Sequence, residues 1–441
     1  MATLPHQPPP IWQQAVRAAP ATPLLCAALF GMMALYGPAL QVIGNLRYIE
    51  ILIIVIAALN LRRIFLYADD ITLRLIQLFL LTAVCQLVSD IVNGAATDGT
   101  IKRVGTYLIF IPVILGMKFL SANDFTRMRW IFFGYALSWI FIYIVGTSAA
   151  PLYQENPWRL GLGWAGSFAL CVLFTYRSNA SLAMGGLLLL LAAGHVVLGS
   201  RAIAIFTLMA GLGSIWAALR GAAEPPRIAL RRVIAILCGI LLAGFLLYQA
   251  LIAATNAGIL PGDVQKRMQM QLASPYGLAA AARPETASAI SAIGRRPILG
   301  WGSTGYDNDI WGYYIDIQNS SYLGRGDYSI IYEQAFNQEW DLGLPSHSHV
   351  FGAWVDAGVF ASLSWFAVLL LASYVLIGAL GWNSALTPLL LFVSGTTIWD
   401  VLFSPGPHRM DMAVRFVILT YAASRMRTSW KEASVERPAP A

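Results

Sequence analysis

The sequence predicts an all-α polytopic membrane protein with about twelve transmembrane helices and one large external loop. Of its 441 residues, 58% are hydrophobic and only 12% are charged, and the mean hydropathy is +0.64. Soluble domains carry about a quarter charged residues. Apolar runs close to the ~20 residues that cross a ~30 Å hydrocarbon core recur along the chain. This composition excludes soluble-enzyme folds and largely disordered chains.

The apolar runs divide the chain into five regions. Residues 1–21 form a Pro-rich tail that we expect to be disordered in the cytosol, and residues 22–254 hold nine spans. Residues 255–349 form the large loop or lid, residues 350–424 hold three more spans, and residues 425–441 form a second cytosolic tail. The spans are expected near residues 22–40, 43–60, 73–93, 102–120, 129–148, 160–176, 180–199, 202–219, 229–254, 350–378, 384–402 and 411–424.

The basic residues predict the orientation of these spans. In the tails and short loops, the Lys and Arg residues lie mostly in clusters on the side of the two termini, and few lie on the other side. Lys and Arg are enriched in cytosolic loops, so the termini are expected in the cytosol and the large loop outside, in the periplasm of a bacterium. The clustering between apolar runs also speaks against a nucleic-acid partner. The short outer loops carry only Lys102, Arg103, Arg159, Arg201 and Arg409.

The large loop is too long to be a plain connection, which indicates a function of its own. Its first part is basic and its second part acidic, and aromatic residues such as Trp301 and Tyr306 crowd it. Aromatic faces and carboxylates suit a sugar ligand, although the same aromatics also suit the hydrophobic core of a lid. The segment 283–297 is expected to form a short amphipathic helix, and residues 300–306 a turn.

Ionisable side chains gather at the predicted outer ends of the spans, where each one is a candidate for function. Arg201 begins a helix after a hairpin with almost no loop, and its forked guanidinium suits two phosphate oxygens. Arg103 and Asp356 lie at the same membrane face. By contrast, Arg47 and Glu50 are three residues apart on one predicted helix and are expected to neutralise each other.

His347 and His349 come directly before a predicted helix, close to Arg283 of the loop in this topology. A helix N-terminus disfavours imidazolium, so a neutral ring there can accept a proton. The alternative is that the neighbouring serines cap the helix and the histidines only flank it. The Asp307–Asn308–Asp309 string suggests a metal-bound diphosphate only weakly, and we expect neither a metal nor another cofactor.

Three segments together resemble the superfamily of O-antigen ligases and of O-antigen and exopolysaccharide polymerases, which are bacterial inner-membrane glycosyltransferases. Each segment alone is a weak signal, but the three flank or lie within the large outer loop in the same order as in that family. The segments are Gly199-Ser200-Arg201; Arg283 followed by Pro297, Gly300 and Gly302; and residues 347–358, from His347 through Asp356 to Gly358.

The resemblance implies a GT-C-like fold and transfer of a glycan from undecaprenyl diphosphate to a sugar hydroxyl. It implies catalytic roles for Arg201, Arg283 and His347, the two arginines neutralising the diphosphate and the imidazole acting on the hydroxyl. Ser348 stands where ligases often have Asn and a second histidine follows, so His347 and His349 both stay open as the acting imidazole. Arg103, His349, Asp356, Trp301 and Tyr306 are the expected substrate-binding residues.

The acceptor decides between two activities within that family. A second lipid-linked glycan would make the protein a polymerase, which the long aromatic loop favours slightly, and lipid A-core would make it a ligase. Membrane lipid surrounds the spans in either case. A secondary transporter is the alternative from another class, but such folds usually carry inverted repeats and broken helices at mid-membrane, and the sequence shows neither.

Overall fold

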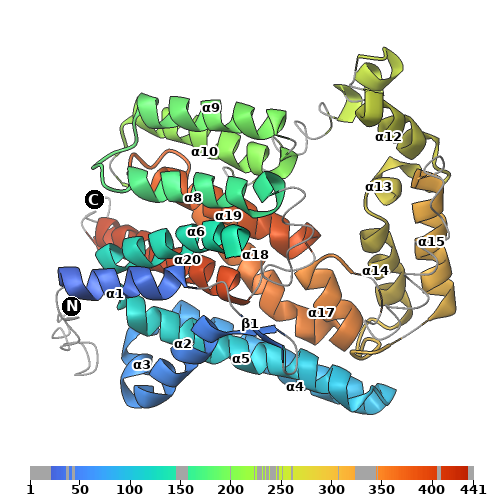
Figure 1. The fold of residues 1–441 in the computed structure, drawn as a ribbon, viewed down its shortest axis with the longest axis horizontal. Helices are drawn as coiled ribbons and strands as arrows, with labels where there is room; N and C mark the ends of the chain where they lie inside the picture. The colour runs from blue at the N-terminus through green and yellow to red at the C-terminus, as the bar shows by residue number, and fades with distance from the viewer. Residues whose placement is uncertain are drawn as a thin grey trace, which may run out of the picture.

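A computed structural model describes most of the chain and shows a bundle of helices with a smaller helical group beside it (Figure 1). The bundle contains α1 to α10 and α18 to α20, and the smaller group, α12 to α15, is joined to it through α17. The described residues are 21–35, 39–41, 45–145, 157–198, 200–222, 224–225, 262–305, 307–322, 344, 346–404 and 409–435, with scattered positions between 231 and 259.

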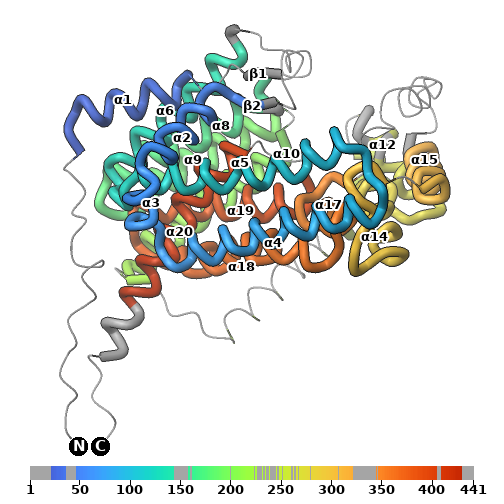
Figure 2. Tube along the Cα trace, turned by 90° about the horizontal axis from the view of Figure 1, so that it is seen from below, coloured from blue at the N-terminus to red at the C-terminus, as the bar shows by residue number. Residues whose placement is uncertain are grey.

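Within the residues that the structure describes, four helices are long and apolar enough to cross a membrane (Figure 2): α4 (Asp70–Asn93), α5 (Thr97–Ser121), α10 (Arg201–Arg220) and α18 (Val359–Ala379). Shorter apolar helices accompany them, so the protein is a helical membrane protein, while the count of twelve spans stays a prediction. The ninth predicted span, at 229–254, lies mostly outside the described residues. The shorter apolar helices are α1 (Pro23–Ala34), α2 (Tyr48–Leu59), α8 (Gly163–Phe174), α9 (Leu182–Val197) and α19 (Thr387–Phe403).

The remaining elements of the bundle are a short hairpin and further helical segments. A two-stranded antiparallel hairpin precedes α2, and its register pairs Ala39 with Arg47. This hairpin departs from the all-α expectation in one small place. The elements are β1 (Ala39–Gln41), β2 (Asn45–Arg47), α3 (Leu61–Tyr67), α6 (Phe125–Val145), the π-helical segment η2 (Trp158–Leu162) and α20 (Arg409–Val435).

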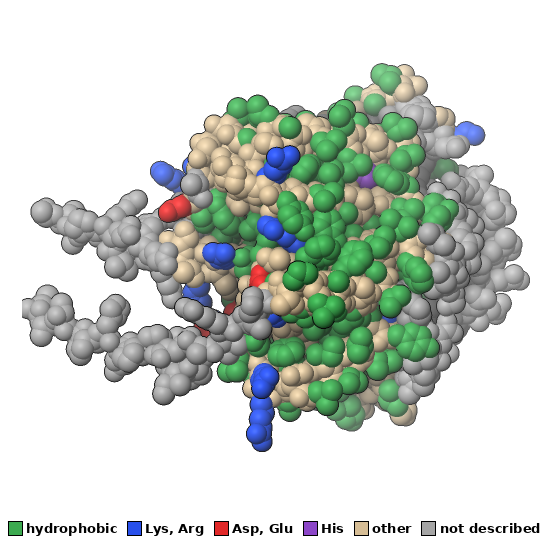
Figure 3. All heavy atoms as spheres, turned by 60° about the vertical axis from the view of Figure 1, so that its left-hand side comes forward, with side chains coloured by type: hydrophobic (Ala, Val, Ile, Leu, Met, Phe, Trp, Pro, Cys, Tyr) green, Lys and Arg blue, Asp and Glu red, His purple; other side chains and the backbone are tan. Residues whose placement is uncertain are grey.

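The outer surface of the bundle is apolar. On the face drawn in Figure 3 hydrophobic side chains predominate, and the visible Lys and Arg side chains lie mostly in its left half. Large apolar side chains point outward from several helices, as in Ile91, Leu190, Val197 and Leu370, each at least 71% exposed. Contact between such an apolar surface and water is unfavourable, whereas the hydrocarbon chains of lipids solvate it well.

The bundle is held together by interlocked aromatic rings and by close helix contacts. Phe79 of α4 packs edge-on against Phe110 of α5 at 5.0 Å and against Trp365 of α18 at 5.2 Å, measured between ring centroids. Where α9 meets α10, a Cβ at Gly185 would lie 2.8 Å from the carbonyl oxygen of Gly211. Small residues of this kind let membrane helices approach closely and gain van der Waals contact.

The predicted tenth span, at 350–378, is wrong as a single helix. The structure divides it at Gly358 into α17 (His349–Ala357) and α18. Gly358 has φ 80°, and a Cβ there would lie only 1.7 Å from the carbonyl oxygen of Ile298. Hydropathy does not distinguish a broken helix from a continuous one, and this break exists because the loop docks against the backbone at Gly358.

The large loop contains helices with a small core of their own. They are α12 (Gly262–Ala273), α13 (Gly277–Ala282), α14 (Pro284–Arg295) and α15 (Asn308–Tyr322). Helix α14 and the following turn confirm the helix and turn predicted for this segment. The turn is fixed to the end of α17, because the N–H groups of Trp301 and Gly302 donate to the carbonyl oxygens of Val355 and Asp356, both at 2.8 Å.

Candidate functional site

The last turn of α19 gathers three segments that are distant in sequence. The guanidinium of Arg283, at the N-cap of α14, lies over the ring of Trp399, 5.3 Å from its centroid. The hydroxyl of Ser348 donates to the carbonyl oxygen of Val401 at 2.9 Å. From the other side, Phe206 of α10 packs edge-on against Trp399 at 6.0 Å. This turn therefore holds the loop, the start of α17 and the start of α10 in one place.

The predicted catalytic histidine pairs with a carboxylate that lies close in sequence to the predicted catalytic arginine. Nδ1 of His347 lies 3.1 Å from Oε1 of Glu285, which follows Arg283 by two residues. Glu285 is 15% exposed and His347 43% exposed, so the carboxylate is shielded while the ring reaches solvent. An Nδ1–H that donates to Glu285 leaves Nε2 of the neutral ring as a proton acceptor.

The electrostatics of this group favour an ionised Glu285. Burial raises the pKa of this carboxyl, but the hydrogen bond with His347, a backbone hydrogen bond and the charges of His347 and Arg283 together lower it more, so that the net pKa lies below its ordinary value of 4.5. The carboxylate is thus negative near neutral pH and can orient the imidazole. We call Arg283, Glu285, His347 and Trp399 the Arg283 cluster.

Arg201 lies at the start of the helix that contacts Trp399, and its guanidinium is exposed. It is the first residue of α10, and Phe206, which contacts Trp399, follows five residues later, about 7 Å along the helix axis. The Arg201 side chain is exposed and has no hydrogen-bond or ion-pair partner within the described part of the chain. Its charge is therefore available to an anion from outside the protein.

A second group of charges lies at the other end of α17. Nε of Arg103 is 3.4 Å from Oδ2 of Asp356, with Arg103 47% exposed and Asp356 6% exposed. Beside them, Oδ1 of Asp90 accepts hydrogen bonds from the backbone N–H of Ser303 at 2.6 Å and from Nε2 of Gln86 at 3.0 Å. We call Asp90, Arg103, Ser303 and Asp356 the Asp356 cluster; Asp356 follows the first residue of α17 by seven residues, or about 10 Å.

The other predicted substrate-binding residues occupy different environments. The ring of His349 stacks on Trp365, with centroids 4.1 Å apart, and its Nε2 is buried, so His349 does not face the outer water layer as expected. Trp301 is 7% exposed and donates through Nε1 to the carbonyl oxygen of Ala292 in the loop core. Tyr306 lies outside the described residues. Of the two histidines, His347 pairs with a carboxylate, while Nε2 of His349 is buried with no hydrogen-bond partner among the described residues.

Sequence analysis missed several charged partners. Glu50 accepts from the backbone N–H of Arg47 at 2.9 Å, but its carboxylate also takes two hydrogen bonds from Arg409, at 3.2 and 3.0 Å. Asp400, directly after Trp399, forms an ion pair with Arg415 of α20. Each pair joins two different helices, so spacing along one helix gave no signal for it.

The acidic string Asp307–Asn308–Asp309 of the loop is paired with Arg295. Nη1 of Arg295 lies 3.1 Å from Asp307 and 3.2 Å from Asp309. Asp307 also caps α15 by accepting from the N–H of Ile310 at 2.9 Å. These contacts give both carboxylates a structural role. In the part of the chain that the structure describes, no group of three or more His, Cys, Asp or Glu side chains converges on a metal site.

No protein-family model matches this chain, and no curated protein sequence is significantly similar to it. The geometry of the two clusters therefore carries the functional argument.

Proposed function

We propose that this protein is a glycosyltransferase that moves a glycan from undecaprenyl diphosphate to a sugar hydroxyl on the periplasmic side of a bacterial inner membrane, acting as an O-antigen or exopolysaccharide polymerase. The observation that carries the proposal is the His347–Glu285 pair, two residues from Arg283, whose guanidinium lies over Trp399 in the last turn of α19. An exposed Arg201 at the same end of the bundle supports it. This arrangement offers two cations and one proton acceptor beside an apolar bundle.

In the proposed reaction, the acceptor hydroxyl oxygen bonds to the anomeric carbon of the donor glycan. The bond from that carbon to the phosphate oxygen breaks, and undecaprenyl diphosphate leaves with the bonding electrons. The hydroxyl proton passes to Nε2 of His347, whose ring Glu285 orients through Nδ1. Arg201 and Arg283 stabilise the negative charge that develops on the leaving diphosphate.

The remaining parts of the molecule fit this role. Trp399 supports the Arg283 guanidinium through a cation–π contact, which limits the positions that the charge can take. The polyprenyl tail would lie along the apolar outer surface of the bundle. The Asp356 cluster presents a half-exposed Arg103 that suits a sugar or phosphate group of the same substrate.

The test is a transfer assay with the purified protein in liposomes. A lipid-linked repeat unit is supplied with and without lipid A-core, and the products are separated by size. A ladder without lipid A-core supports the polymerase, whereas product only with lipid A-core replaces it by the ligase. Loss of product in Arg283→Ala and His347→Ala, with product retained in Arg295→Ala, assigns the chemistry to the Arg283 cluster.

Arg295 is a matched control because it lies on the same helix, α14, and is 43% exposed, yet its partners are Asp307 and Asp309. The absence of product under both conditions, together with uptake of a labelled solute into the liposomes, would replace the enzyme by a transporter.

A further inference from the structure

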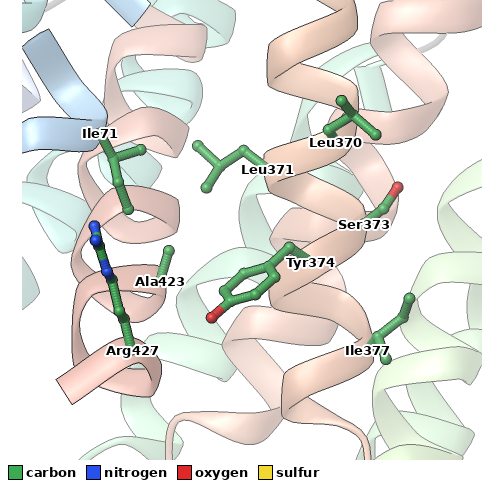
Figure 4. Close-up of a pocket in the computed structure, with 8 residues that line it drawn as sticks. All are labelled: Ile71, Leu370, Leu371, Ser373, Tyr374, Ile377, Ala423 and Arg427. Atoms are coloured by element: carbon green, nitrogen blue, oxygen red, sulfur yellow. The ribbon is translucent and has the colours of Figure 1, made fainter. Parts of the chain in front are cut away.

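Helices α4, α18 and α20 enclose an apolar groove far from both charge clusters (Figure 4). The groove has a volume of about 580 Å³. Leu371 and Tyr374 of α18 point toward Ile71 of α4 and Arg427 of α20. The lining residues are Ile71, Leu370, Leu371, Ser373, Tyr374, Ile377, Ala423 and Arg427.

The groove lies at the membrane face opposite the candidate site. Ile71 is near the start of α4 and Asp90 of the Asp356 cluster is near its end, nineteen residues later, which is about 28 Å along the helix. That length is close to the thickness of the hydrocarbon core. A ligand in this groove is therefore separate from any ligand at the Asp356 cluster.

The chemistry of the lining selects that ligand. The walls are mostly hydrocarbon, and Leu370 at the rim is 71% exposed. Arg427 provides one exposed guanidinium, which has no hydrogen-bond or ion-pair partner among the residues described here and interacts electrostatically with Tyr374. A guanidinium binds phosphate through a planar fork of donors, and an apolar trough beside it suits an acyl chain.

We infer that the groove binds an anionic phospholipid from the leaflet opposite the candidate site, which is the cytosolic leaflet in the proposed orientation. One acyl chain packs against Ile71, Leu371 and Ile377, and the phosphate meets Arg427. The lipid contacts all three helices at once, so its binding stabilises the folded bundle by mass action. The inference does not depend on the proposed glycan transfer.

The test measures lipid retention and thermal stability of the detergent-purified protein. Phosphatidylglycerol or phosphatidylcholine is added back after delipidation, and bound lipid is counted by native mass spectrometry. The wild type should retain phosphatidylglycerol preferentially and melt at a higher temperature with it. Arg427→Ala should bind phosphatidylglycerol about fivefold more weakly, as expected for the loss of one cation at an anionic lipid surface.

Two further variants separate the charge from the groove. Arg425→Ala should behave as the wild type, because Arg425 lies on the same helix but donates to Tyr421 at 3.2 Å and does not line the groove. Ile71→Trp should reduce retention of both lipids by filling the apolar space.

Three outcomes would overturn the inference: equal retention of the two lipids by the wild type, unchanged preference in Arg427→Ala, or equal stabilisation by inorganic phosphate alone. Because lipid retention is read without any glycan substrate, failure here is distinguishable from failure of the transfer assay.

Discussion

The guanidinium of Arg283 lies over the indole ring of Trp399, 5.3 Å from the ring centroid, so a residue of the large loop rests directly on a helix of the bundle. Trp399 in turn contacts Phe206 of α10. The Trp399 ring therefore contacts both the loop cation and the helix that begins with Arg201. The position of the two charges relative to each other depends on this ring.

Removing the ring should weaken transfer without removing a charge. We expect Trp399→Ala to lower turnover about fivefold, because a cation–π contact contributes about 1 kcal/mol. Trp399→Phe, which keeps an aromatic face, should retain most of the activity. Steady-state transfer by both variants measures the effect, and thermal melts confirm folding. Equal activity of the Ala and Phe variants would show that the ring does not position Arg283.

Arg201 should not tolerate replacement by another cation. Arg201→Lys keeps the charge but loses the forked donors, so we expect transfer to fall at least about tenfold while the protein still inserts in the membrane. Arg220→Lys, at the opposite end of the same helix, should leave transfer unchanged. Near-normal turnover of Arg201→Lys would count against a diphosphate clamp at this position.

The Glu285 carboxylate should contribute stability that depends on pH. Its folded pKa lies below the ordinary value of 4.5. Burial raises this pKa, but the hydrogen bond with His347, a backbone hydrogen bond and the charges of His347 and Arg283 together lower it more. A group with a depressed folded pKa stabilises the fold fully well above its ordinary pKa, and this contribution is lost as the pH falls through the folded pKa. The difference in melting temperature between wild type and Glu285→Gln should therefore be constant near neutral pH and shrink below pH 4.5.

Tryptophan-fluorescence melts over a pH series provide this measurement. Asp309→Asn is the control, because Asp309 is 79% exposed and should change the melting temperature little at any pH. A melting-temperature difference for Glu285→Gln that grows on acidification would contradict the stabilising role of the ionised Glu285 carboxylate.

A buried ion pair at the opposite membrane face should matter more for stability than an exposed one. Nζ of Lys118 lies 2.7 Å from Oδ2 of Asp69 and is also bonded to Thr420, and the Lys118 side chain is only 1% exposed. Lys118→Met leaves Asp69 without its cation, so we expect a loss of about 3–5 kcal/mol in the free energy of unfolding. Adding Asp69→Asn to that variant should recover part of the loss.

The matched control is Lys102→Met. Lys102 pairs with Asp98 at 3.7 Å, but the two side chains are 54% and 66% exposed, so the loss should stay below about 1 kcal/mol. Denaturant titration in detergent compares the variants. A similar loss of unfolding free energy in Lys118→Met and Lys102→Met would show that burial does not make the Lys118–Asp69 pair more important for stability.

Periodicity and composition predicted the features that local sequence determines. The helical membrane class follows from the apolar runs, and the loop helix α14 and its turn follow from Pro and Gly positions. The break at Gly358 was not predictable, because it depends on the approach of Ile298 from the loop. Apolar residues continue on both sides of that break, so hydropathy alone does not mark it.

The site was predicted as residue types but not as partners. Arg283 and His347 stood out as ionisable residues near one membrane face, yet Glu285, which pairs with His347, was not singled out from the sequence. The expected local partner of Glu50 was Arg47, but the structure adds Arg409 from a helix 359 residues away. Such pairs form through tertiary packing, and no local pattern in a single sequence indicates them.

Chelation of divalent ions should leave transfer intact. Asp307–Asn308–Asp309 is the acidic string of the loop that sequence analysis considered for a metal, and Arg295 pairs with both carboxylates at 3.1 and 3.2 Å. The cations that meet the diphosphate are then Arg201 and Arg283, whose charge EDTA does not remove. Transfer is measured after EDTA treatment and again after Mg²⁺ or Mn²⁺ is added back. Loss of activity that either ion restores, and that Asp307→Asn abolishes, would move the diphosphate site from the arginines to this string.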